Sequence, residues 1–237
     1  MKKMTKKELK SLLDDFRNKE GEAYLDLTYI SMRTKKLEGM DFSRVDFSNS
    51  DFKNVNFRSC KFDNAKLQHT KFENCDLSGS SFAYADLFAA DLRACDLSGS
   101  NFDGADFFAA LLWEAKLDNL LVTDRTKFFR NYCPEEGYMF GYKKCFNERM
   151  VQLLIPKDAK RCSSTTNACR CDKARVVAIT DVNRKESYKE AMSFVDPNFI
   201  YRLGEMVYAD SYNEDRWHDS SHGIHFWMTF EEALGYM

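Results

Sequence analysis

Residues 85–109 read ADLFA ADLRA CDLSG SNFDG ADFFA, five blocks of five residues with the same internal order. Around them, every fifth residue from Leu37 to Leu117 is Leu or Phe, without a gap. A spacing of five fits neither the 3.6-residue period of an amphipathic helix nor the two-residue alternation of a strand. A short fixed repeat instead predicts a solenoid, in which each unit buries its apolar side against the next unit.

Two positions in each block predict which side chains face inward. One is the Leu or Phe, and the other is a small or modestly apolar residue two positions earlier, such as Ala85 or Cys95. Large and small inward residues in alternation would fill a narrow interior without voids. We therefore predict an inward core made of these large residues: Phe42, Phe47, Phe52, Phe57, Phe62, Leu67, Phe72, Leu77, Phe82, Leu87, Leu92, Leu97, Phe102 and Phe107.

These blocks resemble the pentapeptide-repeat family, whose pattern is roughly A-[D/N]-L-x-x, and the resemblance covers at least residues 37–119. It implies a mainly β fold, a right-handed quadrilateral β-helix in which four pentapeptides make one square coil. The seventeen Leu or Phe positions would then make about four coils. We interpret residues 22–36 as degenerate repeats, so the predicted β-helix spans residues 22–120.

The two flanks of the repeats predict further parts. Residues 1–21 hold a capping box from Thr5 to Glu8 ahead of Leu9 and Leu12, which predicts a helix covering the open end of the solenoid. Residues 121–237 lack the five-residue period and predict a C-terminal α+β domain, with strands at 150–155, 174–180, 199–209 and 223–228 and a closing helix. This domain resembles a module of unknown activity that follows pentapeptide repeats in other bacterial and phage-like proteins.

The composition limits the partners and the compartment. The chain has 35 basic and 37 acidic residues, so it shows no overall bias toward nucleic acid or an anionic membrane. It has no apolar run long enough to span a bilayer, and the basic start MKKMTKKELK has no apolar segment behind it. We predict a cytoplasmic protein with no membrane or direct nucleic-acid partner, and with a monomer favoured over an oligomer.

Cysteine and histidine are the candidate metal ligands. Cys60, Cys75 and Cys95 fall at the small inward position and are predicted core residues. Four others could form a zinc site, although structural zinc sites usually have two tight pairs and this set has one. The default is reduced thiols and no metal or cofactor, with ligand or metal binding left open for two groups: Cys145, Cys162, Cys169 and Cys171, and His218, His222 and His225.

One stretch bears on catalysis. Gly-Ile-His-Phe at 223–226, with Ala233 and Tyr236 downstream, resembles a G-I-Y-F-A…A-x-Y stretch of ADP-ribosyltransferases that forms part of the nicotinamide pocket. His225 replaces the first tyrosine of that stretch, and two residues instead of one separate Ala233 from Tyr236. The few residues after His225 leave no room for the strand that carries the family's catalytic Glu. No phosphate loop or nucleophile motif occurs elsewhere. We predict no catalytic residues and no enzyme activity.

The outward positions suggest an interaction surface. Phe88 and Phe108 are twenty residues apart and should stack on one outer face, and Trp113 takes the equivalent position on the next face. Outward aromatic side chains on a polar solenoid mark a contact surface, either for a partner or for the C-terminal domain. The candidate interaction residues are Phe88, Phe108, Trp113, Asp86, Asp91 and Asp106.

Three functions are compatible with these features. The first is a non-enzymatic scaffold that binds a protein partner of unknown identity, since a rigid solenoid surface loses little entropy on binding. The second follows from the resemblance, which implies that some such solenoids mimic DNA and bind type II topoisomerases (gyrase), protecting them from fluoroquinolones. Residues 76–120 hold eight acidic and two basic side chains, as a mimic would need. The third is a ligand-binding or ADP-ribosyltransferase-like site in the C-terminal domain.

Overall fold

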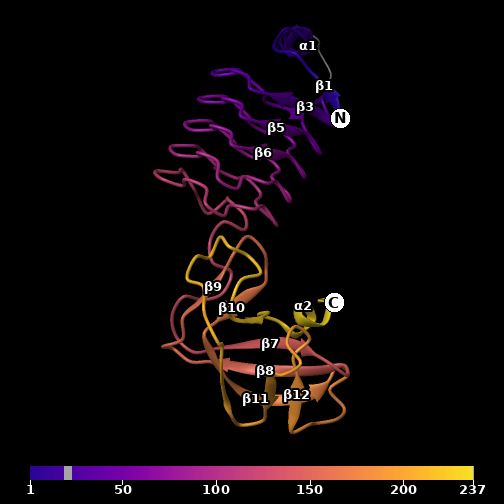
Figure 1. The fold of residues 1–237 in the computed structure, drawn as a ribbon, viewed down its shortest axis with the longest axis vertical. Helices are drawn as coiled ribbons and strands as arrows, with labels where there is room; N and C mark the ends of the chain where they lie inside the picture. Colours follow the sequence, from indigo (N-terminus) through magenta and orange to yellow (C-terminus); the bar gives the residue numbers. More distant parts are fainter. Residues whose placement is uncertain (19–22, 237) are drawn as a thin grey trace. The chain divides into compact units, whose positions relative to one another are not determined.

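The computed structural model describes residues 1–18 and 23–236, so the predicted boundary between residues 21 and 22 lies outside the described residues. The chain divides into two compact units, Met1–Arg130 and Asn131–Met237 (Figure 1). Residues 121–130, which the sequence assigned to the C-terminal domain, belong to the first unit. Leu121 and Lys127 still pair with the preceding coil, at Asn101 and Asp106.

The first unit is a solenoid of parallel pairs between residues twenty positions apart. Leu25 of β2 (Leu25–Asp26) pairs with Val45 of β4 (Val45–Asp46). β3 (Ile30–Arg33), β5 (Asp51–Lys53) and β6 (Lys71–Glu73) continue the same offset. Isolated bridges extend it to Asn101 and Leu121. Since twenty residues contain four pentapeptides, each of the stacked coils in Figure 1 consists of four blocks.

The block sequence explains each corner of a coil. The residue two positions after each Leu or Phe has a left-handed backbone, as at Asn49 (φ 60°) and Asn64 (φ 57°), a conformation that Asn and Gly adopt at low cost. The Asp or Asn just before the Leu or Phe accepts a hydrogen bond from the backbone N–H two residues later, as Asp96 does from Ser98 at 3.0 Å. In the blocks that have Asp or Asn at this position, the side chain thereby supports the bend of the chain.

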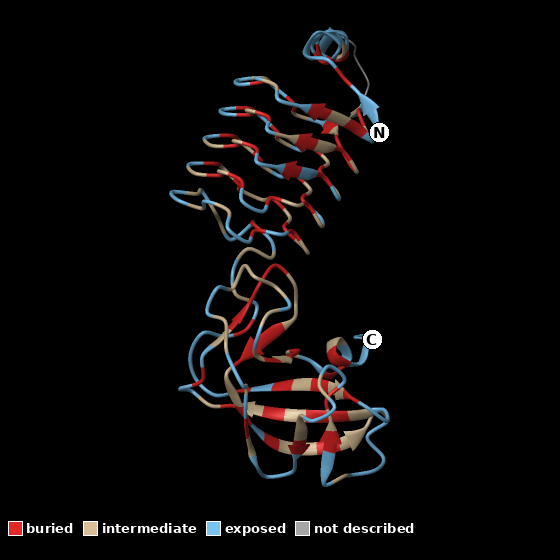
Figure 2. Ribbon diagram, viewed as in Figure 1, coloured by how far each residue is buried: buried red, intermediate tan, exposed pale blue. Residues whose placement is uncertain are grey.

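The interior consists of the predicted large residues from Phe42 to Phe107, each at most 1% exposed, whereas Leu117, the last of the series, is half-buried. Buried positions recur along the coils in Figure 2. Phe62, Phe82 and Phe102 stack in one column, with ring centroids 4.9 Å apart at each step. Ser, Thr and Cys at the small position donate to the carbonyl of the large residue in the neighbouring coil. Ser100 Oγ donates to Leu77 O at 3.0 Å, and Cys95 Sγ donates to Phe72 O at 2.7 Å. Polar groups in this core are thereby hydrogen-bonded.

Both ends of the solenoid are covered by parts of the first unit. β1 (Lys2–Lys3) pairs with β3, and α1 (Lys6–Asn18) buries Leu9, Leu13 and Phe16. Arg17 fixes this helix to the first complete blocks, with its guanidinium 3.1 Å from Asp41 Oδ1 and 2.8 Å from Ser43 O. At the other end, the ring of Phe129 contacts the inward Phe107 at 5.1 Å between centroids.

The second unit is built on a four-stranded antiparallel sheet in the order β14-β11-β8-β7. Its strands are β7 (Met139–Cys145), β8 (Arg149–Ile155), β11 (Lys173–Asp181) and β14 (Met206–Tyr208). A three-stranded sheet contains β9 (Arg161–Ser163), β10 (Cys169–Cys171) and β15 (Ile224–Phe226). A two-stranded sheet joins β12 (Glu190–Met192) to β13 (Ile200–Arg202), and α2 (Phe230–Leu234) closes the described chain.

The second unit differs from the sequence-based expectation in two respects. The stretch 199–209, expected as one strand, is two strands, because Gly204 has a φ of 84° in the turn between β13 and β14. Strands β7, β9, β10 and β12 were not anticipated. Among the described residues, no helix has the length and apolar character needed to cross a membrane.

Candidate functional site

Four aromatic side chains form a column on the outside of the solenoid. The ring of Phe88 lies 5.3 Å from that of His69 and 5.8 Å from that of Phe108. Phe108 in turn contacts Phe128 at 4.8 Å. Phe88 is 36% exposed, whereas Phe108 is half-buried and is partly covered by Phe128. We call His69, Phe88, Phe108 and Phe128 the aromatic column.

Trp113 is 37% exposed and belongs to a different stack of positions. Its carbonyl accepts a hydrogen bond from the backbone N–H of Ala94 at 3.0 Å, one coil away. The twenty-residue spacing therefore puts Trp113 next to Arg93 along the solenoid, whereas Phe108 lies next to Phe88. The sequence predicted these two different faces from spacing alone.

The three candidate acidic residues already have structural partners. Asp86 accepts from the backbone N–H of Phe88 at 3.0 Å, and Asp106 accepts from that of Phe108 at 3.1 Å. Asp91 receives two bonds from the Arg93 guanidinium, at 2.8 and 2.7 Å. These bonds hold the pKa of Asp91 below its ordinary value. Each carboxylate thus builds a turn of its own block, which explains why an acidic or amide residue recurs at this position.

The cysteines are buried and unbridged. Burial raises the thiol pKa of Cys60 to about 11 and those of Cys75 and Cys95 to about 12. In the second unit, Cys145 lies on β7, Cys162 on β9, and Cys169 and Cys171 on β10. Within residues 1–18 and 23–236, no three His, Cys, Asp or Glu side chains are grouped as metal ligands.

The three histidines occupy different environments. His222 is exposed ahead of β15, and His218 Nδ1 lies 3.4 Å from the Asn213 amide nitrogen. His225 lies within β15, and its Nε2 is buried with no hydrogen-bond partner among the described residues. Burial, followed by the positive charges of Lys143 and Arg170, lowers the pKa of His225 to about 4. His225 is therefore a neutral side chain at the edge of the core.

Buried cations surround this histidine. Lys143 Nζ donates to the carbonyl of His225 at 3.1 Å, and burial lowers the pKa of this lysine. Arg170 is 2% exposed, and its guanidinium donates to the carbonyls of Asn213, Asp215 and His218. Hydrogen bonds to backbone carbonyls compensate for burying these charges and fix the loop before β15. The sequence pattern gave no sign of these two residues.

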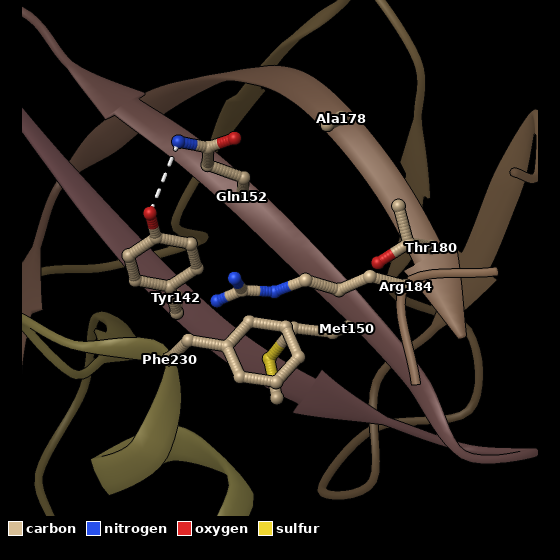
Figure 3. Close-up of a pocket in the computed structure, with 7 residues that line it drawn as sticks. All are labelled: Tyr142, Met150, Gln152, Ala178, Thr180, Arg184 and Phe230. Atoms are coloured by element: carbon tan, nitrogen blue, oxygen red, sulfur yellow. Dashed lines mark hydrogen bonds between the residues drawn. The ribbon is translucent and has the colours of Figure 1, made fainter. Parts of the chain in front are cut away.

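A pocket of about 280 Å³ lies on the four-stranded sheet beside α2 (Figure 3). The guanidinium carbon of Arg184 sits 3.9 Å from the ring centroid of Phe230. The Gln152 amide donates to Tyr142 Oη at 3.2 Å, and the Tyr142 ring meets that of Phe230 at 5.9 Å, edge to face. Sequence reasoning missed this pocket, whose lining residues come from three strands, a turn and a helix: Tyr142, Met150, Gln152, Ala178, Thr180, Arg184 and Phe230.

Comparison with known families defines the class of protein. Residues 33–102 match the family model described as a pentapeptide repeat region, which confirms the resemblance inferred from the five-residue blocks. Residues 129–233 match a family of unknown function (DUF5758), which agrees with the module of unknown activity expected after the repeats. The chain thus contains a pentapeptide-repeat region, followed by a segment that matches this second family. Neither family is described as one of enzymes, and no curated protein matches the chain.

Similar solved structures include three proteins. A pentapeptide repeat protein from the Arabidopsis thaliana thylakoid lumen is 29% identical, with 40% of this chain and 66% of that chain covered and a TM-score of 0.39. Trypsin-treated QnrB1, a plasmid-mediated fluoroquinolone resistance protein, is 24% identical over 41% of this chain and 54% of its own, with a TM-score of 0.37. The pentapeptide repeat protein Rfr23 from the cyanobacterium Cyanothece 51142 is 17% identical over 50% and 97%, with a TM-score of 0.29. The chain thus spans just under two thirds of the first protein and about half of the second.

Proposed function

We propose that this protein is a non-enzymatic scaffold, in which a right-handed quadrilateral β-helix presents the aromatic column to a protein partner. The observation that carries the proposal is the exposed ring of Phe88, stacked on Phe108 along the outside of a solenoid whose other outward positions are mostly polar. Aromatic rings held by a rigid support are the side chains that most often dominate binding energy at protein interfaces.

The charge around the column defines the chemistry of the partner. Residues 76–120, which include Phe88 and Phe108, hold eight acidic and two basic side chains. Opposite charge around an apolar centre speeds association and selects among partners. Several of these carboxylates pair with cations of the solenoid, but Asp86, which accepts from the backbone N–H of Phe88, has no salt bridge among the described residues. We therefore propose a partner protein with an apolar patch that is bordered by Lys or Arg.

The same region argues against DNA mimicry. A mimic needs carboxylates that are free to replace phosphates, yet several are paired with cations along the solenoid. Asp91 pairs with Arg93 at 2.7 Å, and Asp96 pairs with Lys116 at 3.3 Å. Asp103 and Asp106 are paired as well, with Arg125 and Lys127. These pairs reduce the row of negative charge on which the topoisomerase hypothesis depends.

The test uses the full chain as bait in a lysate of the source organism, followed by binding measurements with the purified captured protein. Phe88→Ser should weaken that binding by about thirtyfold, the effect of losing a contact worth about 2 kcal/mol. The matched control is Tyr29→Ser, because Tyr29 is a more exposed aromatic residue elsewhere on the solenoid. Binding should also weaken as salt concentration rises.

Two outcomes would count against the scaffold proposal. Equal binding by wild type and Phe88→Ser, with Phe88→Ser still folded, would remove the aromatic column as the contact surface. Capture of topoisomerase subunits, together with salt-sensitive inhibition of gyrase supercoiling, would favour the mimic instead.

A further inference from the structure

We propose that the pocket on the four-stranded sheet of the second unit binds a small organic carboxylate, with Arg184 as the anion-binding group. The pocket belongs to the second unit and the aromatic column to the first, so the two sites can be tested separately. Its volume of about 280 Å³ is just below the usual range for ligand pockets, which fits a small ligand.

The charge of the pocket favours an anion. Arg184 is the one charged residue among the seven that line it. In the parts of the chain that the structure describes, no Asp or Glu forms a salt bridge with Arg184. Arg149 and Arg175 of this unit also form no salt bridge in the described part of the chain, but each donates to a backbone carbonyl, that of Glu190 and that of Gly204. An arginine without such a partner, facing a pocket, is available to bind an external anion in a bidentate manner.

A rigid turn presents Arg184 to the pocket. The Asp181 carboxylate accepts hydrogen bonds from the backbone N–H groups of Asn183, Lys185 and Glu186, at 3.3, 2.6 and 2.8 Å. Arg184 itself has a φ of 58°, a left-handed conformation that is uncommon for a residue with a long side chain. Such backbone strain persists where surrounding contacts hold it, and it is frequent at binding sites. Here it directs the side chain across the sheet toward Tyr142 (Figure 3).

The other residues that line the pocket supply the remaining contacts for a bound carboxylate. The guanidinium lies 3.9 Å from the Phe230 centroid, so the ring holds its position. Tyr142 Oη accepts its hydrogen bond from Gln152 and keeps its own proton to donate. A carboxylate between Arg184 and Tyr142 could thus receive bonds from both. Met150, Ala178 and the Phe230 ring supply apolar surface for the rest of the ligand, with the Thr180 hydroxyl at the side.

The experiment is a titration of the full chain with benzoate, followed by backbone amide NMR shifts. Benzyl alcohol and benzylammonium serve as neutral and cationic comparators. We expect saturable shifts near Tyr142 and Phe230 with benzoate alone. Arg184→Met should weaken benzoate binding by about tenfold or more, and Tyr142→Phe by a smaller factor, because the charged donor contributes most. The matched control is Arg202→Met, which removes an exposed arginine of the same unit outside the pocket.

The result can also overturn the proposal. Benzoate shifts that stay linear with concentration, or that are equal in Arg184→Met and wild type, would show that no anion site exists there. Saturable binding of benzylammonium that strengthens in Arg184→Met would mean that the aromatic walls bind cations and that Arg184 merely occupies them. Tyr142→Phe retains the ring and so keeps the test valid if Arg184→Met disturbs the turn.

Discussion

Phe82 gives the sharpest test of the inward core. Its ring is fully buried and lies between Phe62 and Phe102, 4.9 Å from each. Phe82→Ala should lower the free energy of unfolding of the solenoid by about 3–5 kcal/mol, through lost burial and the cavity that remains. Phe82→Leu keeps a residue type that neighbouring blocks use, so it should lose mainly the two ring contacts, about 1–3 kcal/mol in total. Phe88→Ala, on the outside of the solenoid, should lower the free energy of unfolding by about 1 kcal/mol.

Hydrogen exchange of the full chain, followed by mass spectrometry, measures this effect without interference from the second unit. Peptides from the coils around Phe82 should exchange about a hundredfold faster or more in Phe82→Ala, if exchange reports local opening. Peptides from residues 131–236 should be unchanged. Equal protection in Phe82→Ala and Phe88→Ala would refute the assignment of the Leu and Phe positions to the interior.

Three further perturbations test the turns, the small inward position and the histidine in β15. Gly104→Ala should lower the free energy of unfolding by about 1–3 kcal/mol in a urea melt, because a Cβ at that position would lie 2.6 Å from the Tyr84 ring and the φ of Gly104 is 72°. In a Tyr84→Ala background, the same substitution should lower it by less. The free energy of unfolding of Cys95→Ser should stay within about 1 kcal/mol of wild type, because a hydroxyl can donate to the Phe72 carbonyl as Ser100 does to Leu77. Cys95→Val has no donor for that carbonyl and should lower the free energy of unfolding by about 1–3 kcal/mol. Since the folded pKa of His225 is lowered to about 4 from 6.5, its contribution to stability is present above pH 6.5 and is lost as pH falls toward 4. Between about pH 7 and about pH 5 the loss in the free energy of unfolding should be about 2 kcal/mol, as measured by urea melts, and it should shrink in His225→Asn.

The repeat region was predictable because one rule governs every residue in it. Each block contains its own turn chemistry, its own large residue and its own small residue, so spacing alone identifies Phe82 as inward and Phe88 as outward. The role of Asp86 and Asp91 was harder to foresee. In the sequence they read as surface charge, whereas in the fold they accept hydrogen bonds within their own block.

The second unit was less predictable because its strands are short or disguised. β7 carries a glycine and two lysines, and Lys143 is buried even though lysine normally marks the surface. Gly141 is required by packing, since a Cβ at that position would lie 2.4 Å from the Phe226 ring. The pocket depends on side chains from several elements that meet only after folding, so no local spacing could indicate it.

The offset of twenty residues between paired positions has a consequence for changes in chain length. Deleting one pentapeptide would keep every Leu and Phe inward, because the interior repeats every five residues. The same deletion between Phe88 and Phe108 would put these two rings on different faces, because the outer surface repeats only every twenty. Duplication or loss of a whole coil preserves both patterns. The fold therefore tolerates insertions or deletions of five residues, whereas the pattern of its outer surface is kept only when the change is a multiple of twenty residues.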